Sequence, residues 1–141
     1  MLSIYPACFF EEENGGYSVV FPDLNYLATQ GDNKSEAFEM AVDCLAGYLY
    51  ACQRDGESAP AASDLNAIDL QRVGAELGDD APRGFVSMVS VDVADYAKKH
   101  FEKSVKKTLS IPAWLNAAAQ EQGINFSQVL QDALKKQLHI G

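Results

Sequence analysis

The chain has 141 residues, of which 48% are apolar and 22% are charged, and this balance excludes disordered and fibrous proteins. No apolar run approaches the roughly 20 residues that a membrane-spanning helix needs. The first fifteen residues contain three glutamates and no Lys or Arg, unlike a secretory signal. We therefore expect a cytoplasmic protein that does not bind membranes.

Charge is distributed unevenly along the sequence. Residues 1–94 carry 16 acidic and 4 basic side chains, a net charge of −12, whereas residues 95–141 carry 4 acidic and 7 basic side chains, a net charge of +3. This asymmetry indicates two modules whose partners have opposite charge, although the acidity alone could serve only solubility.

The three cysteines, Cys8, Cys44 and Cys52, show no C-x-x-C spacing, and their odd number in a chain without an export signal predicts reduced, buried thiols. The only histidines are His100 and His139, too few for a zinc site of the usual kind. We predict neither a metal nor another cofactor.

The N-terminal residues predict three strands in a meander. Residues 2–10 are aromatic and aliphatic, and Pro6, which lacks an N–H, places this strand at a sheet edge. The turn at Asn14–Gly16 leads to a strand over Tyr17–Phe21, and a third strand follows over Leu27–Gln30.

A helix is predicted next, because Asn33 and Glu36 have the spacing of a capping box. Its apolar stripe consists of Ala37, Ala41, Cys44, Leu45, Tyr48, Leu49 and Cys52. Residues 53–84 are rich in Gly, Pro, Ala, Ser and Asp, which is typical of a long irregular connection, with a short helical segment near Leu70.

Residues 85–93 alternate in polarity and predict a fourth strand. A strand reached through a helical crossover usually pairs parallel to an earlier strand, so we expect this strand beside the first and parallel to it. The order β-β-β-α-β predicts an α+β chain whose N-terminal domain, residues 1–94, is a partial ribonuclease H-like fold. A helical turn around residues 94–100 lies in a predicted linker, residues 95–103.

The C-terminal region predicts one strand and two helices. In residues 103–112, Val105, Leu109 and Ile111 alternate with Lys106, Thr108 and Ser110, as in a strand with one apolar face. A helix is expected from Pro112 to Gln122, ended by Gly123. A second capping box at Asn125 to Gln128 begins a helix that reaches about His139, with apolar residues Val129, Leu130, Ala133, Leu134 and Leu138.

About 36 residues are too few to bury a core alone. If two chains pair these strands antiparallel, the backbone groups at the strand edge form hydrogen bonds and the four helices share one core. The polar face of the resulting two-stranded ribbon can then enter the DNA major groove. The alternative is an ordinary helical hairpin in which Lys106 and Lys107 only solvate a strand edge.

Residues 104–139 resemble the ribbon-helix-helix family of DNA-binding repressors, because the strand ends at Pro112, Gly123 breaks the helices and the second helix is capped. The resemblance implies a domain over residues 104–141 that forms by dimerisation, as a homodimer or a higher even-numbered oligomer, and binds operator DNA. The base-reading residues would be Lys106, Thr108 and Ser110, and the phosphate contacts would come from Asn125, Phe126 and Ser127.

The N-terminal half is similar to HicB antitoxins of type II toxin–antitoxin systems. The residues that carry this resemblance are Gly16–Leu24, Thr29–Asp32, Glu36, Ala37, Ala41 and Leu45. The chain departs from the family at Asn25 and Tyr26, where Pro-Gly is common, and at Pro60–Ser63, where a Pro-x-Pro-Ser-like stretch is common.

The resemblance implies that residues 1–94 bind and neutralise a HicA-type toxin, a basic ribonuclease that cleaves mRNA. The charge of −12 independently fits a basic, RNA-binding partner. Candidate contacts with this toxin are Glu11, Glu12, Glu13, Tyr17 and Asp23, although the three glutamates are equally typical of a solvated hairpin loop.

Together these features predict an antitoxin that also represses its own operon. The alternative is a stand-alone ribbon-helix-helix transcription regulator whose N-terminal domain senses a ligand or oligomerises. We do not expect an enzyme. A ribonuclease H-type nuclease needs several carboxylates on two metal ions, and the one compact acidic set is Asp23, Asp32 and Glu36, of which the last two are explained as turn and cap residues.

Overall fold

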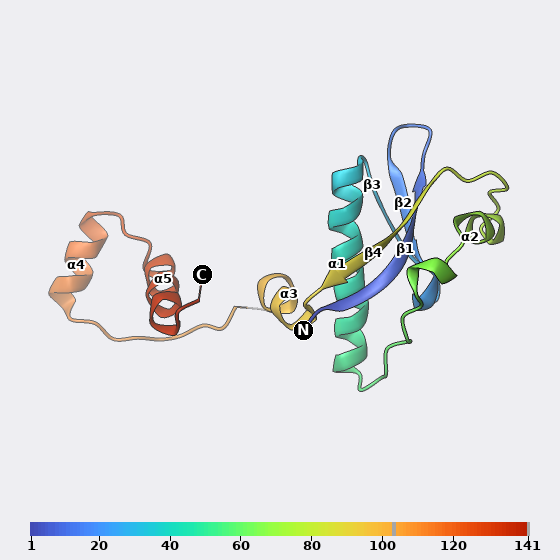
Figure 1. Ribbon diagram of the computed structural model, residues 1–141. Coiled ribbons are helices and arrows are strands. Elements are labelled where there is room, and N and C mark those ends of the chain that lie inside the picture. Colours follow the sequence, from blue (N-terminus) through green and yellow to red (C-terminus); the bar gives the residue numbers. More distant parts are fainter. Residues whose placement is uncertain (103, 141) are drawn as a thin grey trace. The chain divides into compact units, whose positions relative to one another are not determined.

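The computed structural model describes residues 1–102 and 104–140. Lys103, which ends the predicted linker and begins the predicted C-terminal strand, and Gly141, which ends the predicted C-terminal domain, lie outside the described residues. The chain divides into two compact units, Met1–Lys103 and Ser104–Gly141 (Figure 1). The helices of the described residues include none that is both long enough and apolar enough to span a bilayer.

The first unit is built on a four-stranded antiparallel sheet. Its strands are β1 (Ser3–Glu11), β2 (Tyr17–Phe21), β3 (Leu27–Gly31) and β4 (Gly84–Val91), in the order β3-β2-β1-β4. The predicted meander of the first three strands is confirmed, as is the position of β4 beside β1. The α+β class is therefore correct.

The prediction that the first strand lies at an edge is wrong, because β1 pairs with β2 on one side and with β4 on the other. Pro6 is tolerated there because of its position. The N–H of Glu11 donates to the carbonyl of Arg83, so the odd-numbered N–H groups of β1 point toward β4. The nitrogen of Pro6 points toward β2, whose pairing with β1 ends at Cys8.

Helix α1 (Lys34–Arg54) covers one face of the sheet and confirms the predicted helix. The Asn33 side chain accepts a hydrogen bond from the N–H of Glu36 at 2.9 Å, and the Glu36 carboxylate accepts one from the N–H of Asp32 at 3.4 Å. The side chains that α1 buries are Ala37, Ala41, Leu45, Ala46, Leu49 and Cys52, which pack against odd-numbered residues of β1 such as Phe9.

The prediction that β4 runs parallel to β1 is also wrong, since the two strands pair antiparallel. The connection over residues 53–84, expected to be largely irregular, explains why β4 runs opposite to the expected direction. It contains a short 3-10 helix, η2 (Leu65–Ala67), and α2 (Leu70–Glu76), and α2 packs Val73 on Cys8, Phe10 and Val20 of the sheet face opposite α1 (Figure 1). The chain thus runs along one face of the sheet as α1 and returns along the other face through the connection that contains α2. After this return, β4 begins beside the end of β1 and runs in the opposite direction.

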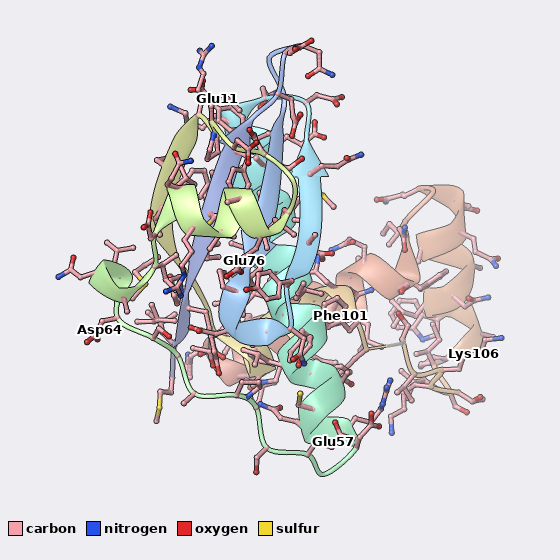
Figure 2. All side chains as sticks on the ribbon, turned by 90° about the vertical axis from the view of Figure 1, so that its right-hand side faces the viewer. Glu11, Glu57, Asp64, Glu76, Phe101 and Lys106 are labelled. Carbon is pink, nitrogen blue, oxygen red and sulfur yellow. The ribbon has the colours of Figure 1, made fainter. Side chains whose placement is uncertain are left out.

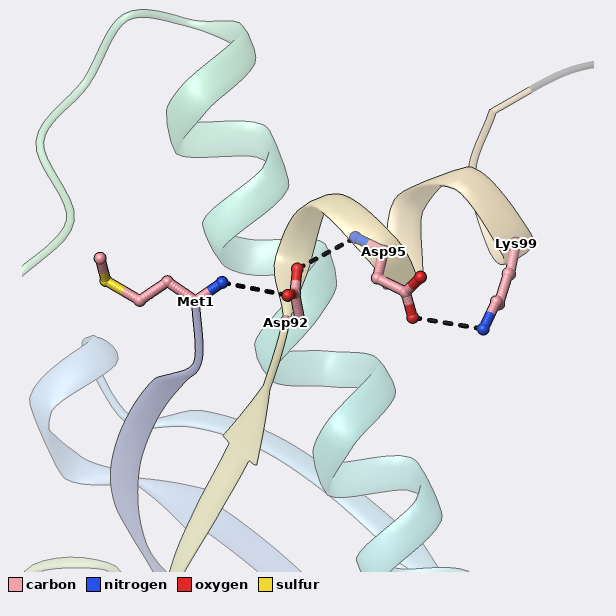
Figure 3. Close-up of polar contacts among 4 residues, drawn as sticks. All are labelled: Met1, Asp92, Asp95 and Lys99. Atoms are coloured by element: carbon pink, nitrogen blue, oxygen red, sulfur yellow. Dashed lines mark hydrogen bonds and ion pairs between the residues drawn. The ribbon is translucent and has the colours of Figure 1, made fainter. Parts of the chain in front are cut away.

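Helix α3 (Val93–His100) begins at Asp92, whose carboxylate accepts hydrogen bonds from the N–H of Asp95 and from the N-terminal ammonium of Met1, both at 3.1 Å (Figure 3). The Asp95 N–H, followed by the Met1 ammonium, holds the pKa of the Asp92 carboxyl below its ordinary value. Lys99 forms an ion pair with Asp95 one turn earlier, at 3.3 Å.

Residues 95–102, most of the predicted linker, are part of the first unit. Tyr96 of α3 donates a hydrogen bond to Asp43 of α1 at 2.8 Å, and burial followed by this bond raises the pKa of Tyr96 to about 12. Ala97 is buried and Phe101 packs against Tyr50. An amphipathic helix with an apolar surface to cover docks on its neighbour instead of remaining a free tether.

The second unit contains α4 (Ala113–Glu121) and α5 (Phe126–Leu138), as predicted. Gly123 between them has a φ of +65°, and the Asn125 side chain accepts a hydrogen bond from the N–H of Gln128 at 3.0 Å. Residues 104–112, where a strand was predicted, form neither helix nor strand in the single chain. A strand needs a neighbouring strand to bond its backbone, and the described residues of this unit include none.

Candidate functional site

An acidic hollow of about 1050 Å³ opens at the hairpin end of the first unit. We call it the acidic groove. The carboxylates that line it belong to Glu11, Glu12, Glu13, Asp32 and Asp79, and its one basic lining residue is Arg83. Figure 2 shows Glu11 at the end of the sheet opposite Glu57 and Asp64.

Turn geometry brings the glutamates to the groove. Asn14 accepts a hydrogen bond from the N–H of Gly16 at 2.9 Å, and Gly15 has a φ of +88°, which reverses the chain between β1 and β2. At Gly16 a Cβ atom would lie 2.9 Å from the carbonyl oxygen of Gly31. This close approach holds the hairpin against the end of β3 and sets Asp32 beside it.

The three glutamates differ in their contacts. Glu11 forms an ion pair with Arg83 at 3.1 Å, and Glu12 accepts a hydrogen bond from the Ser18 hydroxyl at 2.7 Å. The Glu13 carboxylate is exposed and has no such contact among the described residues. Glu13 therefore keeps its charge available to a partner.

An aromatic cluster adjoins the groove. Tyr17 is half-buried, and its ring meets that of Phe85 edge-on with centroids 6.0 Å apart. Phe85 stacks on Phe9 at 4.9 Å, and the ammonium of Lys34 lies 5.4 Å from the centre of the Phe85 ring. Carboxylates beside aromatic faces attract lysine and arginine side chains.

The structure does not place Asp23, the remaining candidate contact, in this groove. Asp23 follows β2 at the end opposite Tyr17. Its carboxylate accepts hydrogen bonds from the N–H of Ser63 at 2.7 Å and from the Ser63 hydroxyl at 2.8 Å. Asp23 therefore anchors the connection between α1 and α2 and has both oxygens engaged.

Two further residues that line the groove, Asp32 and Asp79, are not among the contacts expected from the sequence. The sequence explained Asp32 as a turn residue, and Asp79 lies in the connection that returns over the second sheet face. Only the direction of that connection brings Asp79 to the hairpin end. Within the described residues, no three His, Cys, Asp or Glu side chains are arranged to hold a metal ion.

The candidate DNA-reading residues of the second unit, Lys106, Thr108 and Ser110, are all exposed on residues 104–112. Asn125, Phe126 and Ser127 lie at the start of α5, as predicted. The Asn125 side-chain oxygen is used by the helix cap, but the first-turn N–H groups of Phe126 and Ser127 have no acceptor within the helix and can bind an anion.

Neither α4 nor α5 contains a buried residue. The large apolar side chains that this unit exposes are Val105, Leu109, Ile111, Trp114, Leu115, Ile124, Phe126, Val129, Leu134, Leu138 and Ile140. Such a density of exposed apolar groups in about 38 residues is typical of a surface that a partner covers.

Three comparisons relate the chain to known proteins. A family described as HicB_like antitoxin of bacterial toxin-antitoxin system matches residues 5–133. Antitoxin HicB 1 of Photorhabdus laumondii is 43% identical over 56 residues, which are 40% of this chain and 36% of that protein. Antitoxin HicB of Escherichia coli K12 is 37% identical over 65 residues, 46% of this chain and 47% of that protein. The matches thus span less than half the length of these curated relatives.

Among solved structures, a toxin–antitoxin complex from Streptococcus pneumoniae contains a chain that is 35% identical, with a TM-score of 0.64 over 97% of this chain and 99% of that one. The N-terminal domain of the Burkholderia pseudomallei antitoxin HicB is similar in fold, with a TM-score of 0.50 and 18% identity over 64% of this chain and 99% of that one.

Proposed function

We propose, since the chain belongs to the HicB-like antitoxin family, that it neutralises a HicA-type ribonuclease toxin and represses its own operon. The observation that carries this proposal is the extent of the family match, which runs from residue 5 to residue 133 and includes most of both units. Such an antitoxin has two tasks: to bind a basic toxin and to bind DNA. The first unit is acidic, as the first task requires, and the second unit is basic, as the second task requires.

The first unit would bind the toxin through the acidic groove. Residues 1–103 carry 18 acidic and 7 basic side chains, a net charge of −11. A ribonuclease that binds mRNA presents basic groups to the phosphates, and carboxylates such as Glu13 and Asp32 can take the place of those phosphates. Charge complementarity of this kind accelerates association and fixes orientation more than it raises affinity.

Charge reversal in the groove tests this assignment. Glu12→Lys with Glu13→Lys should slow association with the toxin about tenfold or more at low salt, because the long-range attraction is lost. The matched control, Glu57→Lys with Asp64→Lys, makes the same change of charge at the opposite end of the sheet and should slow association less (Figure 2). Stopped-flow binding to the co-expressed product of the neighbouring gene measures both rates. Equal slowing by the two variants would contradict the groove.

The second unit would pair with a second copy as a ribbon-helix-helix dimer and bind operator DNA. Residues 104–141 carry four lysines and two acidic residues, a net charge of +2. Pairing residues 104–112 of two chains would bond their backbones, cover the exposed apolar side chains and leave Lys106, Thr108 and Ser110 facing outward. Lysine and hydroxyl groups on such a ribbon can donate to base edges in the major groove.

Lys106→Ala with Thr108→Ala should abolish specific binding to the operator while toxin neutralisation is unchanged. Lys136→Ala, near the end of α5, is the control for loss of one lysine and should retain specific binding. Footprinting on the promoter of the operon measures the outcome. A double variant that still gives the footprint would refute the base-reading assignment.

Two further measurements separate the two tasks. Deleting residues 104–141 should remove repression and leave toxin binding, because the first unit has its own core. Operator affinity of the full chain should fall steeply with salt, since lysine–phosphate contacts release counterions. Loss of neutralisation in the truncated chain would contradict the assignment of the toxin to the first unit.

A further inference from the structure

The hairpin loop between β1 and β2 carries the one Asn-Gly pair of the sequence, Asn14–Gly15 (Figure 1). Asparagine amides are among the chemically labile groups of a protein. The backbone nitrogen of the following residue can attack the amide, and a side chain on that residue hinders the approach, whereas glycine has none. The other asparagines all precede larger residues; they are Asn25, Asn33, Asn66, Asn116 and Asn125.

The reaction at such a pair needs only water and a base. The N–H of Gly15 gives up its proton, its nitrogen forms a bond to Cγ of Asn14, and the bond from Cγ to the side-chain nitrogen breaks. That side-chain nitrogen takes up a proton and leaves as ammonia. Water then opens the cyclic imide, at Cγ to leave an aspartate or at the main-chain carbonyl carbon to leave an isoaspartate. The net change is one water consumed and one ammonia released, with no oxidation or reduction.

The turn prepares the carbonyl that is attacked. Oδ1 of Asn14 accepts a hydrogen bond from the N–H of Gly16 at 2.9 Å, and such a donor stabilises the negative charge that develops on the oxygen during attack at Cγ. Asn14 and Gly15 are both exposed. Around Gly15, no heavy atom of the described residues beyond its two chain neighbours lies within 4 Å of the place where a Cβ would stand. Water and base therefore reach this part of the loop.

Two features of the loop slow the reaction. The N–H of Gly15 donates to the carbonyl of Glu12 at 3.1 Å, so the loop must open before this nitrogen can attack. The carboxylates of Glu12 and Glu13 also disfavour an anionic nitrogen beside them. Opening of an exposed loop costs far less than global unfolding, so the reactive form is reached in the folded protein. We therefore expect deamidation that is slower than in a short peptide of the same sequence.

The helix caps show that the hydrogen bond alone does not select Asn14. Asn33 and Asn125 accept the same kind of bond, from the N–H of Glu36 at 2.9 Å and from the N–H of Gln128 at 3.0 Å. Each of them, however, is followed by a residue with a side chain and belongs to the cap of a helix. Asn14 alone combines the polarised carbonyl with a following glycine in a loop.

We propose that Asn14–Gly15 deamidates spontaneously in the free chain and thereby changes the acidic groove, which Asn14 lines. An aspartate at this position keeps an oxygen that accepts from Gly16 and adds a negative charge to the groove. An isoaspartate lengthens the main chain by one carbon and displaces Gly16, whose close approach to Gly31 holds the hairpin against β3. The first product strengthens the attraction for a basic partner, and the second deforms the groove.

Mass spectrometry of the full chain, aged at neutral pH without partners, tests the reaction. The first Lys or Arg of the sequence is Lys34, so trypsin releases Met1–Lys34 as one peptide that contains Asn14, Asn25 and Asn33. Fragment ions locate the mass increase of deamidation, and chromatography separates the aspartate and isoaspartate forms. Asn14 should react about tenfold faster or more than the other two, because only Gly15 leaves its nitrogen unhindered.

Asn14→Gln is the control for the site. Its longer side chain would have to close a larger ring, so the aged variant should show no mass increase at this position. Equal rates at Asn14, Asn25 and Asn33 in the unsubstituted chain would overturn the proposal, as would an Asn14 that stays intact while another asparagine reacts.

Asn14→Asp isolates the effect of the added charge, in an arm that rests on the proposed function. It should associate about twofold faster at low salt with the co-expressed product of the neighbouring gene, measured by stopped flow. Asn66→Asp makes the same change at an exposed residue of η2, which does not line the groove, and should have less effect. Equal acceleration by the two variants would overturn the claimed effect on the groove.

The same gene product distinguishes the modification from the function of the groove. If it occupies the groove, it should slow deamidation of Asn14 in the complex. An unchanged rate in the complex, with Asn14 reacting in the free chain, would contradict toxin binding at the groove and leave the modification site established.

Discussion

The two units of this chain show two ways for a polypeptide to treat its apolar residues. The first unit packs both faces of its sheet, with Phe9 fully buried beneath α1 and Cys8 fully buried beneath α2. The second unit has two well-capped helices and buries nothing within them. Residues close in sequence are enough to cap a helix, but a core needs enough chain to surround it. We therefore expect the second unit, unlike the first, to need a partner.

The chain carries probes that separate the two units. Its single tryptophan, Trp114, lies in α4 of the second unit, and all six tyrosines lie in the first unit. Tryptophan fluorescence therefore follows unfolding of the second unit, and the near-ultraviolet circular dichroism of the tyrosines follows the first. Each of the following variants can be assigned to one unit.

The largest effect is expected from Phe9→Ala, because the Phe9 ring is fully buried and stacks on Phe38 at 4.4 Å and on Phe85 at 4.9 Å. Removing it should lower the free energy of unfolding of the first unit by about 3–5 kcal/mol. Denaturant unfolding followed by the tyrosine signal measures this change. The Trp114 transition should not move, and a shift of similar size there would contradict the independence of the units.

Leu134→Ala is the sharpest test of the second unit. Leu134 is 51% exposed in one chain, so its truncation should cost less than about 0.5 kcal/mol if the chain stays single. If a second copy buries it, the cost should be about 2 kcal/mol or more per chain. We expect the larger value, read from Trp114 fluorescence.

Leu77→Ala is its control, because Leu77 of the first unit is 52% exposed and no partner is proposed for it. The Trp114 midpoint should also rise with protein concentration, as for any unit folded only as a dimer. A midpoint independent of concentration, together with a small effect of Leu134→Ala, would show that the helical pair is stable alone.

Local rules predicted most of the elements, because they depend on residues close in sequence. Asn33 and Asn125 both cap helices as the capping-box spacing indicated, and Gly123 takes the left-handed conformation that ends α4. The glutamates of the groove were also located, because the Asn14–Gly16 turn fixes where the hairpin ends.

The direction of β4 and the role of Asp23 depend on contacts between distant residues. The connection contains few apolar residues, yet Val73 is buried in one cluster with Phe10 and Val20, and Ile68 and Leu70 pack against that cluster, so α2 is held on the second face. Asp23 meets Ser63 only because the connection crosses there, 40 residues later. Neither contact has a periodic signal in the sequence.

Asp23→Asn tests the contribution of the bonds between Asp23 and Ser63 to stability. The amide retains one acceptor oxygen for the two Ser63 donors and loses the charge, so the first unit should lose about 1–2 kcal/mol of unfolding free energy. Asp64→Asn, an exposed control in the same connection, should have little effect. Toxin affinity of the folded Asp23→Asn variant should be unchanged, and a weakened complex would return Asp23 to the binding surface.

The smallest effect is expected at Asp92, where a charged cap begins the last helix of the first unit. The folded-state pKa of this carboxyl lies below its ordinary value of 3.8, so its charge stabilises the first unit above that value and the contribution is lost as the pH falls through the folded pKa.

Asp92→Asn keeps a side chain that can cap α3 and removes only the charge seen by the Asp95 N–H and the Met1 ammonium. The variant should therefore be less stable than the unsubstituted chain at about pH 7, and the difference should vanish as the pH falls below the folded-state pKa of Asp92. Unfolding midpoints from the tyrosine signal across this range measure it. A difference that persists at the acidic end would mean that the lost contribution is the geometry of the cap and not its charge.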